Sequence, residues 1–298
     1  MKTPIRWPAE AIWQAVAPQL PGFTVEVLPS VDSTNTELMR RARAGRCEPT
    51  LLVAEQQTAG RGRLGRDWHS GLEGVPADTE GDLPSLTFSL GLLLAPGSWS
   101  GLSLAVGVSV AESLQPLPPP AGSPTPRIGL KWPNDLWLAS SAGERKLGGI
   151  LVETASFLAP QDADGSARAS AQRYVVVGVG LNVWPRSGAA GLALPPGCLH
   201  EVDEQLDAPT ALARVVPPLV AMLQLFETYG FAPLQARFDR RDVLHNREVV
   251  LSDGSSGTAH GVAPDGALRV HTAQGMQSIT SSDISVRPAS AAATLQRR

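Results

Sequence analysis

The pattern of the chain changes near residue 245, and this change limits the possible folds more than any other feature. Four short apolar runs follow, and the turns between them include Asp253-Gly254 and Asp265-Gly266. An aspartyl-glycine pair between alternating runs is the strongest short-range signal for a β-hairpin, because the tight turn needs positive φ angles. The sequence therefore predicts a small all-β domain over 245–298, in the size range of small barrels.

Residues 1–244 combine apolar strands with helices, which predicts an α+β domain. The expected strands are 24–28, 51–54, 86–94, 127–132, 136–138, 147–154 and 174–183. The expected helices are 8–20, 34–44, 103–114, 210–229 and 234–244. Three insertions interrupt the pattern, of which 71–84 and 116–126 are expected to be loops and 159–172 a surface hairpin.

The charge balance and the few cysteines exclude several classes of protein. The 298 residues carry a net charge of −3 with a pI near 6.0, which argues against a nucleic-acid-binding domain. Cys47 and Cys198 form neither a disulfide framework nor a metal-binding spacing, which favours a reducing compartment. The sequence has no apolar run long enough for a membrane helix and no signal peptide, so we expect a cytoplasmic protein.

The segment 55–69 is the strongest indication of a ligand site. It reads Glu-Gln-Gln-Thr-Ala-Gly-Arg-Gly-Arg-Leu-Gly-Arg-Asp-Trp-His, so that Arg61, Arg63 and Arg66 alternate with glycines. Arginine offers forked donors that suit carboxylates and phosphates, and glycine lets the backbone approach a ligand closely. The loop predicts a site for a small anionic ligand, although a solvated basic loop would have the same composition.

Residues 60–65 also match Gly-x-Gly-x-x-Gly, the fingerprint of dinucleotide-binding proteins. That fingerprint needs a strand before it and a helix that opens at the loop. The run 51–54 would serve as the strand, but 67–71 is a poor start for a helix. A dinucleotide-dependent enzyme is therefore a distant alternative, and a βαβ unit opening at Gly60 would identify it.

Five separated segments occur in an order that identifies a resemblance. They are Ser33-Thr34-Asn35, the 55–68 loop, Lys131-Trp132-Pro133-Asn134-Asp135, Lys146-Leu147-Gly148-Gly149-Ile150-Leu151-Val152-Glu153 and Gly178-Val179-Gly180-Leu181-Asn182. In this order they closely resemble the biotin–protein ligases, which attach biotin to the carrier domains of carboxylases. The likeness runs from about residue 25 to residue 185, and the combination is specific although no single segment is.

The resemblance implies a fold and a reaction. The fold would be a mixed β-sheet catalytic domain with flanking helices over 1–244, of the class II synthetase-like kind that biotin and lipoate ligases share. An SH3-like β-barrel would follow over 245–298. Biotin and ATP would form biotinyl-5′-AMP and pyrophosphate, with Mg²⁺ on the phosphates of ATP. A lysine of the carrier domain would then attack the mixed anhydride.

The resemblance also implies roles for individual residues. The implied biotin-binding residues are Ser33, Thr34, Asn35, Gln57, Arg61, Gly62, Arg63 and Lys146. The implied nucleotide-binding residues are Trp132, Asn134, Asp135 and Asn182. Lys146, Arg61 and Arg63 would carry the catalysis, because fixed cations aimed at the transition-state oxygens offset the repulsion between two anions. No resident metal site is implied.

Several of these residues also have ordinary structural explanations. Thr34-Asn35-Thr36-Glu37 fits a capping box, so Ser33 and Thr34 would serve the following helix with or without a ligand. Trp132 belongs to a residue type that more often packs than stacks on a ligand, and Arg66 is the loop arginine expected to be structural.

Two further features leave alternatives open. Gly178 and Gly180 lie in an expected strand and indicate a close approach, either by a ligand or by a neighbouring side chain. The adenine-stacking residue is expected within 184–200, but no motif there identifies it.

The expected partner is a biotin carboxyl carrier domain of acetyl-CoA carboxylase or a related carboxylase. About thirty residues precede Ser33, too few for the DNA-binding domain of some family members. We therefore expect a monofunctional ligase without DNA or membrane partners, either a monomer or a weak homodimer. The alternatives are a lipoate–protein ligase, which shares fold and chemistry, and a non-catalytic protein that stores biotin or its adenylate.

Overall fold

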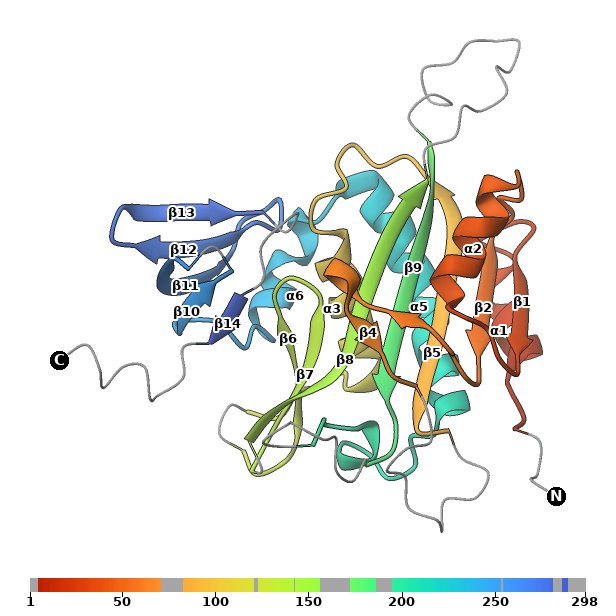
Figure 1. Ribbon diagram of the computed structural model, residues 1–298, viewed down its shortest axis with the longest axis horizontal. Helices are drawn as coiled ribbons and strands as arrows, with labels where there is room; N and C mark the ends of the chain where they lie inside the picture. Colours follow the sequence, from red (N-terminus) through yellow and green to blue (C-terminus); the bar gives the residue numbers. More distant parts are fainter. Residues whose placement is uncertain are drawn as a thin grey trace.

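A computed structural model gives the fold of the protein (Figure 1). It describes residues 5–70, 83–120, 123–141, 143–155, 172–185, 195–252, 254–280 and 286–288. The predicted insertions 71–84 and 159–172 therefore lie almost wholly outside the described residues. The described residues of 116–126 lie in no helix or strand, as predicted.

The larger part of the chain is built on a seven-stranded mixed sheet, in the order β1-β2-β5-β9-β8-β7-β6. Its strands are β1 Thr24–Leu28, β2 Thr50–Ala54, β5 Ser85–Leu94, β6 Arg127–Lys131, β7 Asp135–Ser140, β8 Gly143–Ala155 and β9 Arg173–Asn182. β1 and β2 run parallel, and the other neighbouring strands run antiparallel. Every strand predicted for this region is present, and the predicted mixed sheet is confirmed.

The two faces of this sheet differ because successive side chains of a strand point to opposite sides. Phe88 and Leu90 of β5 belong to the main apolar core, together with Val177 of β9. Between them, Ser89 faces the other side, and its partner across the strand pair is Gly178. One face is therefore a packed apolar core, whereas the other is polar at its centre.

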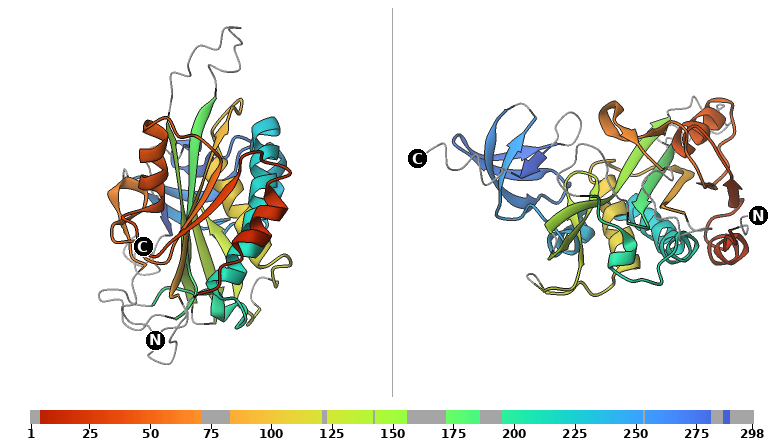
Figure 2. Two further views of the ribbon diagram at one scale, coloured as in Figure 1. Left: turned by 90° about the vertical axis from the view of Figure 1, so that its right-hand side faces the viewer. Right: turned by 60° about the horizontal axis from the view of Figure 1, so that its bottom comes forward.

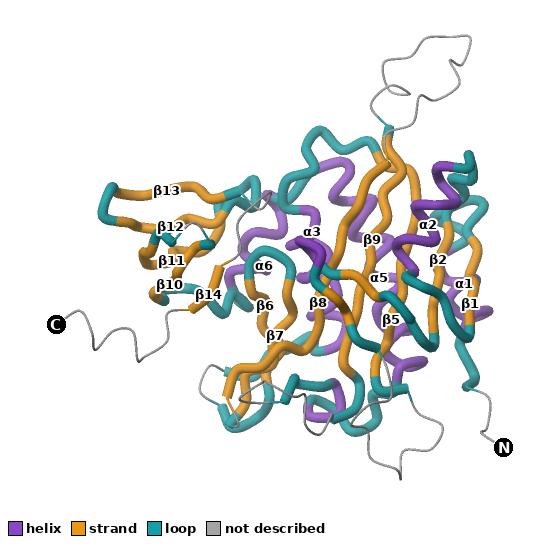
Figure 3. Tube along the Cα trace, viewed as in Figure 1, coloured by secondary structure: helices purple, strands orange, loops and turns teal. Residues whose placement is uncertain are grey.

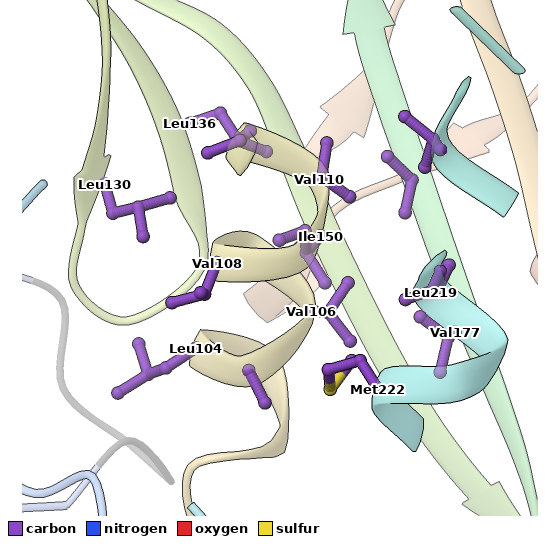
Figure 4. Packing of buried hydrophobic residues seen from close by; sticks show 14 of the residues in the cluster. Leu104, Val106, Val108, Val110, Leu130, Leu136, Ile150, Val177, Leu219 and Met222 are labelled. Carbon is purple, nitrogen blue, oxygen red and sulfur yellow. The ribbon is translucent and has the colours of Figure 1, made fainter. Parts of the chain in front are cut away.

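Helices cover both faces of the sheet. They are α1 Ala9–Val16, α2 Thr34–Arg43, α3 Leu102–Leu114 and α5 Ala208–Tyr229. Figure 2 shows the sheet edge-on, with α2 on one side and α1 and α5 on the other. Figure 4 shows Val106 of α3 packed near Ile150 of β8 and Met222 of α5. Most of α3 is buried because it packs against β6 and β8 of the sheet and also against α5, which accounts for its apolar sequence.

The N-terminus of α2 is capped by Ser33 rather than by Thr34. The Ser33 Oγ accepts a hydrogen bond from the backbone N–H of Thr36 at 3.4 Å. Glu37, the expected partner in a capping box, instead pairs with Arg41 at 2.8 Å and also with Arg40. Since Ser33 supplies the cap, the hydroxyl of Thr34 is left for contacts on the polar face of the sheet.

By length and composition, α5 would be able to cross a membrane. Half of its most apolar stretch is buried inside the protein, however, and its buried side chains belong to the main core. A core helix passes the same test of length and hydropathy, and the packing of α5 on α3 and β5 accounts for its apolar sequence.

The predicted helix over 234–244 is wrong in its second half. η3 Ala232–Leu234 and α6 Gln235–Asp239 form a short helical stretch that ends at Asp239. The chain then runs beside β6, where the Leu130 N–H donates to the Arg241 carbonyl at 2.7 Å and the Val243 N–H donates to the Leu130 carbonyl at 3.0 Å. These bonds cover the open edge of the sheet, and local helix propensity does not register them.

The C-terminal part of the chain is a five-stranded antiparallel sheet in the order β13-β12-β11-β10-β14. Its strands are β10 Glu248–Leu251, β11 Ser256–Val262, β12 Leu268–Thr272, β13 Gly275–Ile279 and β14 Val286–Pro288. Gly266 has a φ of +81°, as the predicted hairpin turn requires. Figure 3 shows this sheet beside the larger one, so the predicted small β domain is confirmed. The boundary at residue 245 stays a prediction.

The hairpin between β11 and β12 docks the small domain on the large one. The Trp132 Nε1 donates to the Gly266 carbonyl at 3.0 Å, and the Ser100 Oγ donates to the Asp265 carbonyl at 2.6 Å. A Cβ added to Gly266 would lie 2.7 Å from the Cα of Gly101. The two domains therefore meet with backbone in direct contact, and a larger residue at 266 would separate them.

Candidate functional site

A cavity lies over the polar face of the central strands, next to the start of α2. It encloses about 740 Å³, its open mouth included. Residues from distant parts of the chain line it: the start of α2, the 57–68 segment, the β6–β7 turn, β8 and β9. The predicted site residues that line it are Ser33, Thr34, Asn35, Gln57, Arg61, Gly62, Arg63, Asn134, Asp135 and Lys146.

Two glycines of β9 form the floor of this cavity. A Cβ added to Gly178 would lie 2.1 Å from the Asn35 Oδ1, and one added to Gly180 would lie 2.6 Å from the Trp68 ring. Both distances are far below van der Waals contact, so only glycine lets these two side chains reach the sheet. The close approach predicted from the sequence is therefore made by neighbouring side chains, which form the walls of the cavity.

A set of polar side chains, here called the polar cluster, comprises Thr34, Asn35, Gln57, Ser89 and Glu153. The Gln57 Oε1 accepts hydrogen bonds from the Thr34 N–H at 2.8 Å and lies 3.2 Å from the Thr34 hydroxyl. The Asn35 Nδ2 donates to the Leu151 carbonyl at 3.2 Å and to the Glu153 Oε2 at 3.0 Å. The Ser89 Oγ lies 2.6 Å from both the Thr34 Oγ1 and the Asn35 Oδ1. The cluster is therefore fixed by its own hydrogen bonds.

The arginine-rich loop forms a short hairpin, here called the arginine hairpin (60–68). β3 Gly60–Arg61 pairs with β4 Asp67–Trp68, and the one-turn helix η1 Arg63–Gly65 lies between them. No helix opens at Gly60, so the alternative of a dinucleotide-binding βαβ unit is wrong. Leu64, at the tip, has a φ of +57° and is 60% exposed. An exposed β-hairpin tip with a leucine in the left-handed region is a strained element.

Trp68 and Arg61 connect the arginine hairpin to the rest of the site. The Trp68 ring lies on Gly180 of the floor. The Arg61 guanidinium lies 3.7 Å from the Glu153 Oε1, which makes a partly exposed ion pair. Glu153 therefore contacts the polar cluster with one carboxylate oxygen and the arginine hairpin with the other.

Lys146 reaches the cavity because of a β-bulge. The register between β7 and β8 shifts at this place, so that Leu136 pairs with Gly148 but Trp137 pairs with Lys146. The extra residue, Leu147, is buried in the main core. A bulge re-aims a side chain, and here it places the Lys146 Nζ in the cavity, 2.8 Å from the Asp135 Oδ1.

The charges around the cavity favour an anion. Six charged side chains line it, of which four are cationic (Arg61, Arg63, Arg66 and Lys146) and two are anionic. One of the anions, Asp135, is already paired with Lys146. Cations fixed in a concave site raise the local potential and attract negative ligands. Arg66, expected from sequence to be structural, lines the cavity with the other two arginines.

Two predicted nucleotide-binding residues lie outside this cavity. Trp132 is 1% exposed and is held at the domain interface by its bond to Gly266. Asn182 is buried, and its Nδ2 donates to the Gly197 carbonyl at 3.2 Å and to the Lys146 carbonyl at 3.4 Å. Both residues have structural partners in this arrangement, and their nucleotide contacts stay predictions.

The segment in which the adenine-stacking residue was expected is only partly described. Trp184 stacks on His200 with ring centroids 3.6 Å apart. Burial raises the pKa of the Cys198 thiol to about 12, so this cysteine stays protonated and unreactive at neutral pH. η2 Leu199–Glu201 follows it. The stacker itself stays unassigned.

The sequence reasoning missed four polar residues that shape the site. Ser85, Thr87 and Ser89 alternate with apolar residues along β5, and Glu153 ends the segment that begins at Lys146. Thr87 lines the cavity, and its Oγ1 donates to the Ala54 carbonyl at 2.9 Å. Polar residues repeated at a period of two in an otherwise apolar strand were the available signal, because they define one polar face.

Comparison with known proteins gives consistent similarities. Residues 245–287 match the family described as Biotin protein ligase C terminal domain. The chain is 35% identical over 257 residues to the Escherichia coli bifunctional ligase/repressor BirA, covering 84% of this chain and 70% of that protein. It is 38% identical over 161 residues to the biotin–[acetyl-CoA-carboxylase] ligase of Mycobacterium tuberculosis, covering 53% of this chain and 49% of that protein.

Solved structures extend the similarity to the fold. The biotin protein ligase from Aquifex aeolicus in complex with biotin and ATP matches with a TM-score of 0.66 and 26% sequence identity. The match covers 89% of this chain and 99% of that chain. The match therefore extends over most of this chain and nearly all of the other.

Proposed function

Because the chain belongs to the biotin protein ligase family, we propose that it joins biotin to a protein lysine in two ATP-dependent steps. In the first step, a biotin carboxylate oxygen attacks the α-phosphorus of ATP to form biotinyl-5′-AMP, and pyrophosphate leaves. In the second step, the lysine amine attacks the acyl carbon, an amide C–N bond forms, and AMP leaves. The enzyme is a ligase that forms carbon–nitrogen bonds.

This proposal rests on the residues that line one cavity. Three uncharged members of the polar cluster, Thr34, Asn35 and Gln57, line the same space as three arginines and Lys146. A ligand with a polar uncharged ring and a carboxylate needs both kinds of contact. We assign the ring of biotin to the polar cluster with Ser33, and its carboxylate to the cations.

The cations have a specific task in the first step. A carboxylate and a triphosphate repel each other, and the transition state gathers still more charge on the phosphoryl oxygens. Lys146, Arg61 and Arg63 are proposed to stabilise those oxygens, and the Gly62 backbone lets the hairpin approach the ligand. Loss of one such contact typically costs ~10²–10³ in rate.

Asp135 is proposed to position Lys146. Its carboxylate lies 2.8 Å from the Nζ and keeps the ammonium aimed into the cavity before substrates bind. Asn134 fixes the turn that carries Asp135, because its Nδ2 donates to the Ile150 carbonyl at 2.8 Å. Both residues are proposed to lie on the nucleotide side, and Trp132 and Asn182 to support that side through the interface and β9.

Mg²⁺ is proposed to enter with ATP, bound to the triphosphate, as part of the substrate. Among the described residues, no group of three or more His, Cys, Asp or Glu side chains is arranged to hold a metal ion. Two carboxylates of the described part of the chain, Asp67 and Asp135, line the cavity, and the second is paired with Lys146. This donor set suits a metal that keeps its oxygen ligands on the nucleotide.

The acceptor is proposed to be a biotin carboxyl carrier domain. The related proteins of Mycobacterium tuberculosis and Paracoccus denitrificans are named biotin–[acetyl-CoA-carboxylase] ligases. The adenylate is a mixed anhydride that water also hydrolyses, so the site must exclude water between the two steps. The arginine hairpin, whose tip at Leu64 is exposed, is proposed to order over the adenylate.

ATP–pyrophosphate exchange tests this proposal most directly. Purified protein is assayed with biotin, with lipoate and with neither, and we expect exchange that depends on biotin alone. Exchange with lipoate would retain the chemistry and replace the substrate. Biotin binding without any exchange would support a non-catalytic biotin-binding protein and overturn the proposed reaction.

A further inference from the structure

Ser89 of β5 is a buried serine at the centre of the polar cluster. It is 0% exposed and does not line the cavity. Its Oγ nevertheless lies 2.6 Å from the Thr34 Oγ1 and 2.6 Å from the Asn35 Oδ1, and both of those residues do line the cavity. Distances this short between oxygens require a proton in each gap. The positions of these protons decide what the cavity presents to a ligand.

The amide of Asn35 fixes the first proton. Its Nδ2 contacts the Leu151 carbonyl and the Glu153 carboxylate, which only accept hydrogen bonds. If the amide were flipped, its oxygen would face two acceptors with no proton between them. The oxygen of Asn35 therefore faces Ser89, and the Ser89 hydroxyl must donate to it.

The second proton follows from the first, because a hydroxyl has only one proton to donate. Ser89 gives its proton to Asn35, so the proton between Ser89 and Thr34 must come from Thr34. The hydrogen bonds thus run in one direction, from Thr34 to Ser89 to Asn35 to Glu153. This chain ends on a carboxylate that cannot donate in return while it is ionised.

The consequence appears at the cavity wall. With its proton committed to Ser89, Thr34 presents only lone pairs there. The Gln57 Oε1, fixed as an oxygen by the Thr34 N–H at 2.8 Å, lies 3.2 Å from the Thr34 Oγ1. The Thr34 hydroxyl lies within hydrogen-bond distance of both oxygens, and its single proton goes to the shorter contact with Ser89 at 2.6 Å rather than to Gln57 at 3.2 Å. The Thr34 and Gln57 oxygens then both face the cavity as acceptors, and an N–H donor from a ligand would satisfy both.

We propose that Ser89 is a positioning residue that holds the Thr34 hydroxyl as a hydrogen-bond acceptor and so selects ligands with a ring N–H. This inference rests on the proposed function and deepens it. The ureido ring of biotin carries two N–H donors, whereas the dithiolane ring of lipoate carries none. Ser89 would thus contribute to specificity without touching the substrate.

The test compares wild type with Ser89→Ala in biotin-dependent pyrophosphate exchange. The alanine variant releases the Thr34 proton, and the KM for biotin should rise ~10-fold, the value of one neutral hydrogen bond. The kcat at saturating biotin should change less than ~2-fold, because the cations near the reacting carboxylate are untouched.

The decisive readout is a ratio of substrates. Two biotin analogues, each methylated on one ureido nitrogen, lack one N–H donor each. Wild type should discriminate more strongly against one of them, and its preference for biotin over that analogue should fall ~10-fold in Ser89→Ala. Oxybiotin, which keeps the ureido ring, should show an unchanged ratio to biotin. If Ser89 only supports the fold, all KM values rise by one factor, the ratios stay constant and the proposal is overturned.

Two further variants keep the test interpretable. Ser109→Ala removes a buried serine hydroxyl from α3 and should change no ratio. Thr34→Val should lower the methylbiotin ratio by itself, and adding Ser89→Ala to it should have no further effect on the ratio; additive losses would contradict action through Thr34. Should exchange be absent in wild type, the proposed reaction fails, and calorimetric binding of the same ligands still tests Ser89.

Discussion

The polar cluster and the arginine hairpin line one cavity but are built in opposite ways. The polar cluster lies on the central strands, and its members bond to one another and to backbone carbonyls. The arginine hairpin has two residue pairs in its ladder, and its tip is exposed and left-handed at Leu64. The polar cluster is held rigidly by these bonds, whereas the arginine hairpin is a short element that Trp68 and Arg61 connect to the rest of the site.

Selectivity and catalysis can therefore reside in separate parts of one site. Neutral hydrogen bonds depend on direction, so groups that recognise a ring must be held rigidly. Charges act over longer distances and tolerate movement, so cations can sit on a hairpin that adjusts to the ligand. We expect changes in the polar cluster to affect biotin affinity, and changes in the cations to affect the chemical step.

The largest effect is expected for Lys146→Ala, which removes one of the cations that line the cavity. Biotin-dependent pyrophosphate exchange should fall at least ~10²–10³-fold, because one fixed cation is lost at the developing charge. Lys146 is 44% exposed, so the melting temperature should stay close to that of wild type. Unchanged pyrophosphate release would refute a catalytic role for this lysine.

Gly178→Ala should disrupt the polar cluster instead. The new Cβ would stand 2.1 Å from the Asn35 Oδ1 and displace that side chain from the floor. We expect biotin to bind ~100-fold more weakly and the free energy of unfolding to fall by ~1–3 kcal/mol, the usual cost of overpacking. Gly97→Ala is the matched control, since a Cβ there meets nothing within 4 Å. Isothermal titration and urea unfolding give both quantities.

Arg63→Ala should affect the binding of biotinyl-5′-AMP and of free biotin to different extents. Biotinyl-5′-AMP should dissociate ~10–100-fold faster, since a charge-assisted hydrogen bond to phosphate is lost. Free biotin should bind within ~3-fold of wild type, because its ring contacts the polar cluster and Arg61 and Lys146 remain for its carboxylate. Stopped-flow release of the adenylate and titration of biotin measure the two effects, and an equal loss of both would remove the division of labour.

Asp242 lies outside both the polar cluster and the arginine hairpin, and its substitution should change stability alone. Burial raises the pKa of the Asp242 carboxyl from 3.8 to about 6, although the Leu244 N–H donates to its Oδ1. The folded state thus binds this proton more tightly than the unfolded chain, so this group destabilises the fold increasingly as the pH rises from about 4 to about 6. Asp242→Asn should gain ~1–2 kcal/mol of unfolding free energy at pH 7 and little at pH 4.

The same variant should leave biotin affinity and exchange unchanged, which thermal unfolding and exchange assays across this pH range would check. A stability gain that was equal at both pH values would contradict the assignment to Asp242. A loss of activity would mean that the chain between α6 and β10 affects the site.

Local signals predicted most of the fold and much of the site. The aspartyl-glycine turn at 265–266 and the apolar strands appear as expected, because turn chemistry and alternation act over a few residues. The helix predicted over 234–244 was wrong in its second half, since pairing of Arg241 and Val243 with Leu130 is a long-range contact. Ser89 was missed for a related reason: its importance comes from partners on α2 that lie far away in sequence.

The short turn between β6 and β7 has a consequence for protein engineering. Trp132 binds the carbonyl of Gly266 in the small domain, and three residues later Asp135 contacts Lys146. A designer who grafts a foreign C-terminal domain at residue 245 would therefore also alter the support of the lysine. Exchange of this domain requires a donor whose hairpin presents a glycine carbonyl to the tryptophan, so the two parts of the enzyme behave as one unit in recombination.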